Sequence, residues 1–231
     1  MSPILMDMRQ RPPVLAHEKF QELKQEFEGL PVDQVFERIH EVNLWGSRDS
    51  VSGLGSNLDS TARIRQLLPE LLWDLGVRSM LDIPCGDFHW LSQAVLPIER
   101  YIGADIVEEI VSRNRAAHPL HEFRKLDLCN DGLPQVDLVH CRDCLVHLSH
   151  RNLMQAIANL KRSRSTWLLT THFLDCDFNA EIETGDWRMI NFEQPPFSWP
   201  PPSQVLLEGC READGGYGDK SLALWRIADL P

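Results

Sequence analysis

The sequence has no long apolar run and no concentration of basic residues. No stretch approaches the roughly twenty apolar residues that a helix needs to cross a bilayer, and the N-terminus lacks a basic segment followed by an apolar one. Of 231 residues, 34 are Asp or Glu and 23 are Lys or Arg, which gives a formal charge of −11. We therefore expect no membrane span, no secretion signal, and no attraction to nucleic acid or to an anionic membrane.

Cysteine is too scattered to form a disulfide framework. The chain is long enough to bury a sizeable core, so its six Cys are expected to be free thiols in a reducing cytoplasm. Four potential metal ligands do fall close together, at Cys141, Cys144, His147 and His150. Structural zinc sites usually pair two ligands on a turn with two distant ones, whereas four ligands entering one helix drift around its axis. We therefore expect no bound metal.

Glycine is scarce at the turn where a nucleotide site is expected. A β-prone run at 79–83 is followed by a break at 84–86 and then by helix-spaced apolar residues, Phe88, Leu91 and Val95. Strand, turn and helix in that order present backbone N–H groups to a polar ligand group. A pyrophosphate requires close backbone approach at several glycines, and only one is present, so a dinucleotide is disfavoured.

The rest of the chain alternates between strand and helix patterns. Apolar periodicity predicts helices at about 17–30, 32–42, 57–75, 87–96, from 106 onward, and 149–162. Strands are predicted at 79–83, 101–105, 122–127, 135–144 and 165–171, with two more at 204–211 and 220–226 around a glycine-rich turn. Five strands separated by helices predict an α/β fold with a doubly wound, mostly parallel sheet, and the last two predict an antiparallel hairpin. Residues 1–15 have no periodicity and are expected to be loose.

Two segments each allow two interpretations. The loop at 43–56 is rich in Gly, Ser and Asn and contains Trp45, which either pins the loop to the core or closes over a ligand as a lid together with Ser47, Ser52 and Ser56. The segment 191–202 is rich in proline and aromatic residues, and it forms either a surface for a partner or a rigid wall against the fold.

An acid ends the second strand, at Asp105, where nucleotide-binding α/β folds place a carboxylate for ribose hydroxyls. The first turn, 81–88, resembles the first motif of the class I S-adenosylmethionine-dependent methyltransferases, an acid followed by alternating glycines. Asp82 and Gly86 hold matching positions, while Pro84 and Phe88 replace two of the glycines. The resemblance covers residues 79–227 and implies a seven-stranded Rossmann-like sheet with a C-terminal antiparallel hairpin. It divides the chain into an N-terminal helical extension with the lid loop, 1–75, and a cofactor-binding domain, 76–231.

The resemblance also implies a site for S-adenosylmethionine at the carboxyl ends of the first four strands. Its residues are Asp82, Pro84, Cys85, Gly86 and Asp87 for the methionine portion, Asp105 for the ribose, Asp127 and Leu128 for the adenine, and Cys141 and Arg142 for closing the pocket, with Trp45 as an addition. For Asp127, a local turn is the alternative interpretation.

Candidate acceptor-side residues follow the fourth and fifth strands. Asp143, His147 and His172 are possible bases, and an imidazole titrates near neutrality, which suits a hydroxyl or amine acceptor. Arg188 and Asn191 are candidates for binding a carboxylate or sugar on the acceptor, because Arg offers forked donors to a carboxylate.

The sequence thus predicts a methyltransferase that acts on an oxygen, nitrogen or sulfur nucleophile of a small molecule, sugar or peptide. Three alternatives remain: the same fold with a modified donor or another transferred group, a nicotinamide-dependent oxidoreductase, and a non-catalytic binding module. The missing glycines disfavour the oxidoreductase. The oligomeric state is left open.

Overall fold

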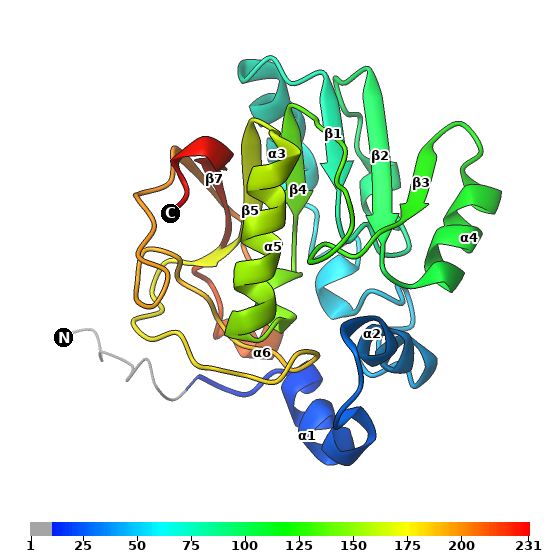
Figure 1. The fold of residues 1–231 in the computed structure, drawn as a ribbon, viewed down its shortest axis with the longest axis vertical. Coiled ribbons are helices and arrows are strands. Elements are labelled where there is room, and N and C mark those ends of the chain that lie inside the picture. The colour runs from blue at the N-terminus through cyan, green and yellow to red at the C-terminus, as the bar shows by residue number, and fades with distance from the viewer. Residues whose placement is uncertain (1–10) are drawn as a thin grey trace.

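A seven-stranded sheet forms the centre of the computed structural model, which describes residues 11–231 (Figure 1). Its strands are β1 (Ser79–Asp82), β2 (Arg100–Asp105), β3 (Glu122–Lys125), β4 (Leu138–Cys141), β5 (Trp167–Phe173), β6 (Gln204–Leu207) and β7 (Lys220–Arg226). The order across the sheet is β3-β2-β1-β4-β5-β7-β6. The first five strands are parallel, and β7 is antiparallel to both β5 and β6. The predicted doubly wound, mostly parallel sheet with a C-terminal antiparallel hairpin is therefore confirmed.

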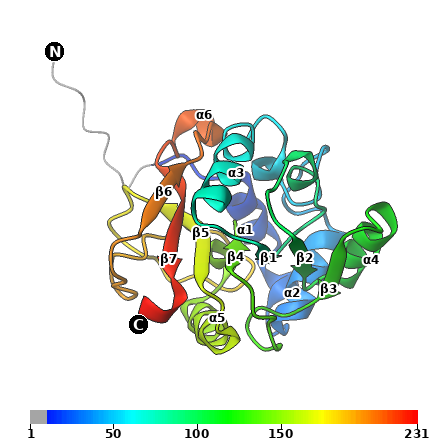
Figure 2. The same cartoon turned by 90° about the horizontal axis from the view of Figure 1, so that it is seen from above.

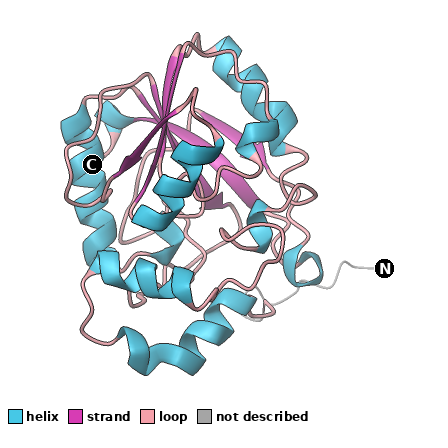
Figure 3. Cartoon of the chain, turned by 90° about the vertical axis from the view of Figure 1, so that its right-hand side faces the viewer, coloured by secondary structure: helices cyan, strands magenta, loops and turns pink. Residues whose placement is uncertain are grey.

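Helices cover both faces of this sheet because successive strand residues point to opposite sides. The helices are α1 (Leu15–Phe27), α2 (Val32–Glu41), α3 (Ile64–Asp74), α4 (Glu108–Ala117), α5 (His150–Ser163) and the short α6 (Glu212–Gly215). The apolar side of α3 packs with Met80 and Leu138, whereas that of α5 packs with their neighbours Leu81 and Val139 on the opposite face. Figures 2 and 3 show helices on both sides of the strands.

Helices α1 and α2 pack against each other and lie across the end of the sheet at which β1 and β2 finish (Figure 1). Their shared core contains Phe20, Phe27, Val35 and Ile39, and the first two rings stack with their centroids 4.8 Å apart. By contrast α3, which the sequence analysis placed in the same N-terminal extension, packs on the sheet itself. The predicted division at residue 75 stays a prediction.

The prediction of a helix at 87–96, after the first strand, is wrong. Residues 87–96 contain a single 3₁₀ turn, Leu91–Gln93, and no α-helix. Phe88 has a left-handed backbone with φ of 55°, and its ring packs against Tyr101 and Phe123. Val95 is 87% exposed, so it shares no buried face with Phe88 and Leu91. Phe88 and Leu91 belong to the same buried cluster, but Val95 lies in solvent, so the three residues form no helical stripe, and no helix N-terminus stands at this turn.

The C-terminal segments also differ in detail from the expectation. Strand β6 ends at Leu207 rather than near 211, and α6 occupies part of the predicted hairpin turn. The proline-rich segment folds inward: Phe192 stacks on Trp199 at 4.0 Å, and the Trp225 indole donates to the carbonyl oxygen of Pro200 at 2.8 Å. The aromatic side chains of the segment are therefore part of the core, which agrees with the rigid-wall interpretation.

The expectation that residues 1–15 are loose falls largely outside the described residues, which begin at 11. Val14 is buried, and α1 begins at Leu15. Among the described helices, none combines the length and apolarity required to span a bilayer.

Candidate functional site

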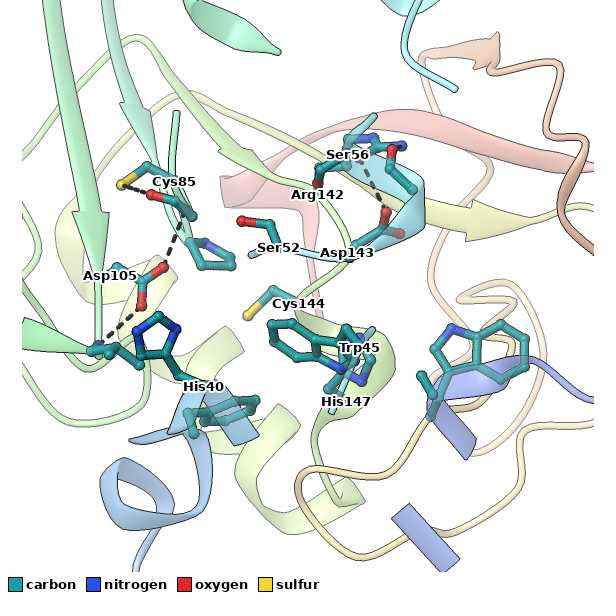
Figure 4. A pocket seen from close by; sticks show the side chains of 18 of the residues that line it. His40, Trp45, Ser52, Ser56, Cys85, Asp105, Arg142, Asp143, Cys144 and His147 are labelled. Carbon is teal, nitrogen blue, oxygen red and sulfur yellow. Dashed lines mark hydrogen bonds and ion pairs between the residues drawn. The ribbon is translucent and has the colours of Figure 1, made fainter. Parts of the chain in front are cut away.

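A cavity of about 430 Å³ lies at the carboxyl ends of β1, β2 and β4. The chain order reverses between β1 and β4, and such a reversal opens a crevice in which α/β sheets bind ligands. Residues from α1, from α2 and from the loop at 52–56 complete its walls. Figure 4 shows Asp105 on one side of the cavity, Arg142 and Asp143 on the other, and Trp45 beside His147.

The first turn holds the Asp105 carboxylate at the edge of the cavity. The Gly86 N–H donates to its Oδ2 at 3.1 Å, and the Val107 N–H donates to its Oδ1 at 3.0 Å. Gly86 has a φ of 53°, which a residue with a side chain adopts only at a cost. Burial raises the pKa of Asp105 to about 6, against the opposing effect of these backbone donors. Each oxygen keeps a free lone pair, so the carboxylate can accept further hydrogen bonds from a ligand.

Asp82, at the end of β1, is already occupied by protein partners. Its Oδ2 accepts from the Tyr101 hydroxyl at 2.8 Å, and its Oδ1 lies 2.7 Å from Nδ1 of His140. With the proton on Nδ1, the Nε2 of His140 is an acceptor; this atom is buried and has no hydrogen-bond partner among the described residues. His140 lines the cavity. His140 is not among the predicted site residues, although a His at the end of an otherwise apolar strand was a usable signal.

Asp87 lines the cavity, and its carboxylate also accepts hydrogen bonds from the predicted lid loop. The Ser50 hydroxyl and the Val51 N–H donate to its carboxylate at 2.9 and 3.0 Å. The neighbouring Ser52 hydroxyl packs so closely on Gly86 that a Cβ there would lie 2.0 Å from its Oγ. The loop therefore sits directly on the turn. Ser52 and Ser56 line the cavity, whereas the Ser47 hydroxyl is buried and donates to Asn57 at 2.9 Å.

Trp45 lines the cavity beside His147, with the two ring centroids 5.3 Å apart. Its indole N–H is buried and has no partner among the described residues. At the far end, Asp127 and Leu128 also line the cavity. The Asp127 carboxylate accepts from the Cys129 N–H at 2.7 Å. This bond forms a local turn, which was the alternative to adenine binding for Asp127.

Buried charges form the wall opposite Asp105. The Arg142 guanidinium donates to both oxygens of Glu208, at 3.0 and 2.7 Å, and Lys220 donates to Asp143 at 2.8 Å. Burial opposes ionisation of Asp143, but the adjacent Lys220 and Arg142 charges outweigh it and hold the pKa of Asp143 well below its ordinary value. A carboxylate of such low basicity is poorly suited to accept a proton.

His147 has the opposite character. Its Nδ1 lies 2.8 Å from the Asp186 carbonyl oxygen, which can only accept, so Nδ1 carries the proton and Nε2 keeps its lone pair. Burial lowers the pKa of His147 below its ordinary value, so the ring is neutral at neutral pH. The ring lines the cavity, and no described residue hydrogen-bonds Nε2. Nε2 is therefore available as a proton acceptor.

Four predicted site residues lie outside this cavity. His172 is fully buried, stacks on Phe192 and accepts from the Phe192 N–H at 3.3 Å, and burial lowers its pKa to about 4. Cys141 is fully buried in the core. The Asn191 side chain is also buried, and its Oδ1 accepts from the Glu193 N–H at 3.0 Å. Arg188 lines a separate pocket. The roles predicted for the first three have no support in this geometry, because their side chains are committed to the interior.

The Cys and His residues at 141–150 do not converge. Cys141 lies in the core, His147 lines the cavity, and His150 pairs with Glu181 at 2.5 Å. Within residues 11–231, no group of three or more His, Cys, Asp or Glu side chains is arranged to hold a metal ion.

Solved structures share this architecture at low sequence identity. The N-methyltransferase NodS from Bradyrhizobium japonicum, in complex with S-adenosylhomocysteine, is 15% identical with a TM-score of 0.58, over 82% of this chain and 97% of its own. The magnesium protoporphyrin IX methyltransferase from Synechocystis, with bound S-adenosylmethionine, is 13% identical with a TM-score of 0.54, over 86% and 98%. A methyltransferase from Clostridium acetobutylicum is 9% identical with a TM-score of 0.53, over 73% and 91%. No family model and no curated protein sequence matches.

The chain has the class I methyltransferase fold. This confirms the fold that the resemblance implied. In this methyltransferase fold the cavity lies at the β1–β4 reversal, and Arg142, Asp143 and Lys220 line it.

The buried ion pair between Arg142 and Glu208 leads to a prediction about stability. Glu208→Ala leaves Arg142 buried with one carboxylate fewer, and we expect a loss of about 3–5 kcal/mol in the free energy of unfolding. Glu26→Ala is the matched control, because Glu26 accepts from Arg38 at the same distance of 2.7 Å but on the surface. Urea unfolding of both variants measures the difference. Equal losses would show that burial of the Arg142 pair does not matter.

Proposed function

We propose that the chain is an S-adenosylmethionine-dependent methyltransferase that transfers a methyl group to an oxygen, nitrogen or sulfur nucleophile of a small molecule, sugar or peptide. The observation that carries the proposal is the Asp105 carboxylate. It ends β2, is held by two backbone N–H groups, and faces a cavity of about 430 Å³ with lone pairs to spare. Such a carboxylate suits the two hydroxyls of a ribose. The presence of S-adenosylmethionine or S-adenosylhomocysteine in two structures of the same fold supports it.

The lining of the cavity fits an adenosyl sulfonium. The turn at 84–87 and the Nε2 of His140 would hold the methionine portion, with Nε2 accepting from its amino group. Asp105 would bind the ribose, and Leu128 with Asp127 would contact the adenine. Carboxylates of this lining favour a cationic donor by Coulomb attraction. Cys85, Asp87 and Asp82 would act mainly by shaping this end, because Asp82 and Asp87 already bind protein groups.

A dinucleotide fits less well. Pyrophosphate binding needs room for phosphate oxygens over a glycine-rich turn. Here the Ser52 hydroxyl occupies the space directly over Gly86, and Phe88 follows in place of a further glycine. These contacts argue against the nicotinamide-dependent alternative.

The chain's own groups then account for transfer. Bound S-adenosylmethionine supplies an electrophilic methyl group, and a displacement of this kind gains most from holding donor and acceptor in line. His147 accepts a proton from a hydroxyl, thiol or ammonium group of the acceptor at Nε2, because its proton is on Nδ1. Trp45 and the loop at 52–56 exclude water from this region. Asp143 and Arg142 would position the acceptor without exchanging protons.

Calorimetry with S-adenosylhomocysteine tests the donor site. We expect binding to the wild-type chain and a loss of about 10- to 100-fold in affinity for Asp105→Asn, because hydrogen bonds to a charged group are strong. Since the pKa of Asp105 is about 6 in the free protein, affinity should rise as the carboxyl ionises, between about pH 5 and pH 7. That rise should be absent in Asp105→Asn.

Asp74→Asn is the control for this experiment, because Asp74 is exposed on α3, away from the cavity. The proposal requires wild-type affinity in that variant. No binding of either S-adenosylmethionine or S-adenosylhomocysteine to the wild-type chain would remove the proposed function, and tight binding of a nicotinamide dinucleotide would favour the rival.

His147 generates a second functional prediction. An acceptor is first found by testing transfer of a labelled methyl group to a panel of amines, phenols and thiols. With that acceptor, we expect His147→Asn to lower turnover by about 10²–10⁴-fold. Asparagine keeps an N–H for the Asp186 carbonyl but offers no base. Affinity for S-adenosylhomocysteine should not change. His121→Asn is the matched control, because His121 is exposed and does not line the cavity. Equal turnover in the two variants would exclude His147 as the base.

A further inference from the structure

A second pocket lies between α1 and the segment 180–188. Its volume is about 1010 Å³, and it is separate from the cavity at the strand ends. Apolar side chains supply much of its lining, including Phe20, Leu30 and Ile182. One cation, Arg188, is buried in its wall.

Arg188 has no partner for its charge. The residue is 4% exposed, and none of its three guanidinium nitrogens has a hydrogen-bond partner among the described residues. Burial lowers its pKa to about 10, so the group still carries its charge at neutral pH. A buried charge without a partner is costly, because water no longer solvates it. The arrangement suits a site that is completed by an anion.

The neighbouring carboxylates are committed elsewhere. Asp186 accepts from Gln21 at 2.8 Å and lies 2.7 Å from Nδ1 of His17. Glu181 pairs with His150 at 2.5 Å and also accepts from the His150 N–H at 2.9 Å. The Asp186 and Glu181 carboxylates make the electrostatic potential at Arg188 more negative, but neither hydrogen-bonds to its guanidinium. The forked donors of Arg188 therefore have no acceptor among the described residues, and they match the geometry of a carboxylate oxygen pair.

The pocket is joined to the candidate site through its wall. Trp187 lines both cavities. The Gly185 N–H donates to the carbonyl oxygen of His147 at 2.8 Å, and the Arg188 N–H donates to that of Val146 at 3.1 Å. The segment that carries Arg188 is thus bonded to the backbone that carries His147. Trp187 therefore forms a wall shared by the two cavities, and Arg188 and His147 lie on segments that are bonded to each other.

We propose that Arg188 binds a carboxylate of the methyl acceptor, and that the acceptor is an organic acid with an apolar body. The claim that the bound acid is the methyl acceptor rests on the proposed function, whereas carboxylate binding at Arg188 does not. The apolar part of the lining, which includes Phe20, Leu30 and Ile182, fits the body of the acid. A monoanion is favoured over a phosphate dianion, because the lining also contains Glu28, Glu181, Glu183 and Asp186 against the cations Arg188 and Lys24.

The proposal is tested by titrating the full chain with phenylacetate and with octanoate. Each acid is compared with its amide and with inorganic phosphate. We expect the two acids to bind and the amides and phosphate to bind at least about tenfold more weakly. Arg188→Met should lose the preference for acid over amide. The same variant should unfold at a higher temperature than the wild type, by about 3 °C or more without ligand, because it removes an unpaired buried charge.

Lys24→Met is the matched control, since Lys24 lines the same pocket but is half-exposed and already paired with Glu183 at 2.9 Å. It should keep the preference for acids. A lower unfolding temperature for Arg188→Met, acid binding that survives in that variant, or tighter binding of phosphate than of the acids would overturn the proposal.

Titration in the presence of S-adenosylhomocysteine separates the two claims. A ternary complex with the acid is expected, and displacement of one ligand by the other would contradict an acceptor site beside the donor. If the acids bind and S-adenosylhomocysteine does not, the proposed function fails while the Arg188 site stands. If S-adenosylhomocysteine binds and the acids do not, the Arg188 inference fails while the proposed function stands.

Discussion

The parallel pairing of β1 with β2 on one side and β4 on the other is the constraint on which the candidate site depends. Asp82 pairs in register with Gly103 and with His140. This register ends the three strands at one edge and brings Asp82, Asp105 and His140 to the same cavity. A slip of one residue would turn each side chain to the other face of the sheet. The apolar layers under α3 and α5 exclude such a slip, because each face is buried.

Burial then decides what each polar group at this edge can do. Asp105, Asp143 and His147 lie in one cavity, yet their pKa values do not shift in the same direction. Burial dominates at Asp105 and raises its pKa, whereas the Lys220 and Arg142 charges prevail at Asp143 and lower it. His147 is neutral and has its proton fixed by a backbone carbonyl. Environment therefore sets these three groups apart, and under the proposed function they would serve as a hydrogen-bond acceptor for ribose, a fixed negative charge and a proton acceptor.

The sheet could be predicted because its information is local. Apolar strand runs, helical periodicity between them and a terminal pair of strands were enough to anticipate the order of elements, and the acid that ends β2 was visible as Asp105. The same reasoning failed at 87–96, where Phe88 and Leu91 are buried and Val95 is in solvent. Spacing alone does not distinguish a helical stripe from a turn whose ring packs on distant strands.

The remaining site features depend on contacts between distant parts of the chain. Neither the hydrogen bond of Asp82 with His140 nor the hold of Asp87 on the loop at 50–52 has a local signature. His172 lies near the carboxyl end of an apolar strand, as a catalytic residue could, but the proline-rich segment covers it with Phe192. Arg188 was singled out for its chemistry, while its pocket and the lack of a partner for its charge came only from the structure.

The central claim is that the cavity at the ends of β1, β2 and β4 holds an adenosyl sulfonium. A crystal structure of the chain grown with S-adenosylhomocysteine tests it most directly. The account predicts the ribose hydroxyls on Asp105, the adenine against Leu128 and the amino group within hydrogen-bond reach of His140 Nε2. A ligand bound elsewhere, or a ribose that does not contact Asp105, would contradict it.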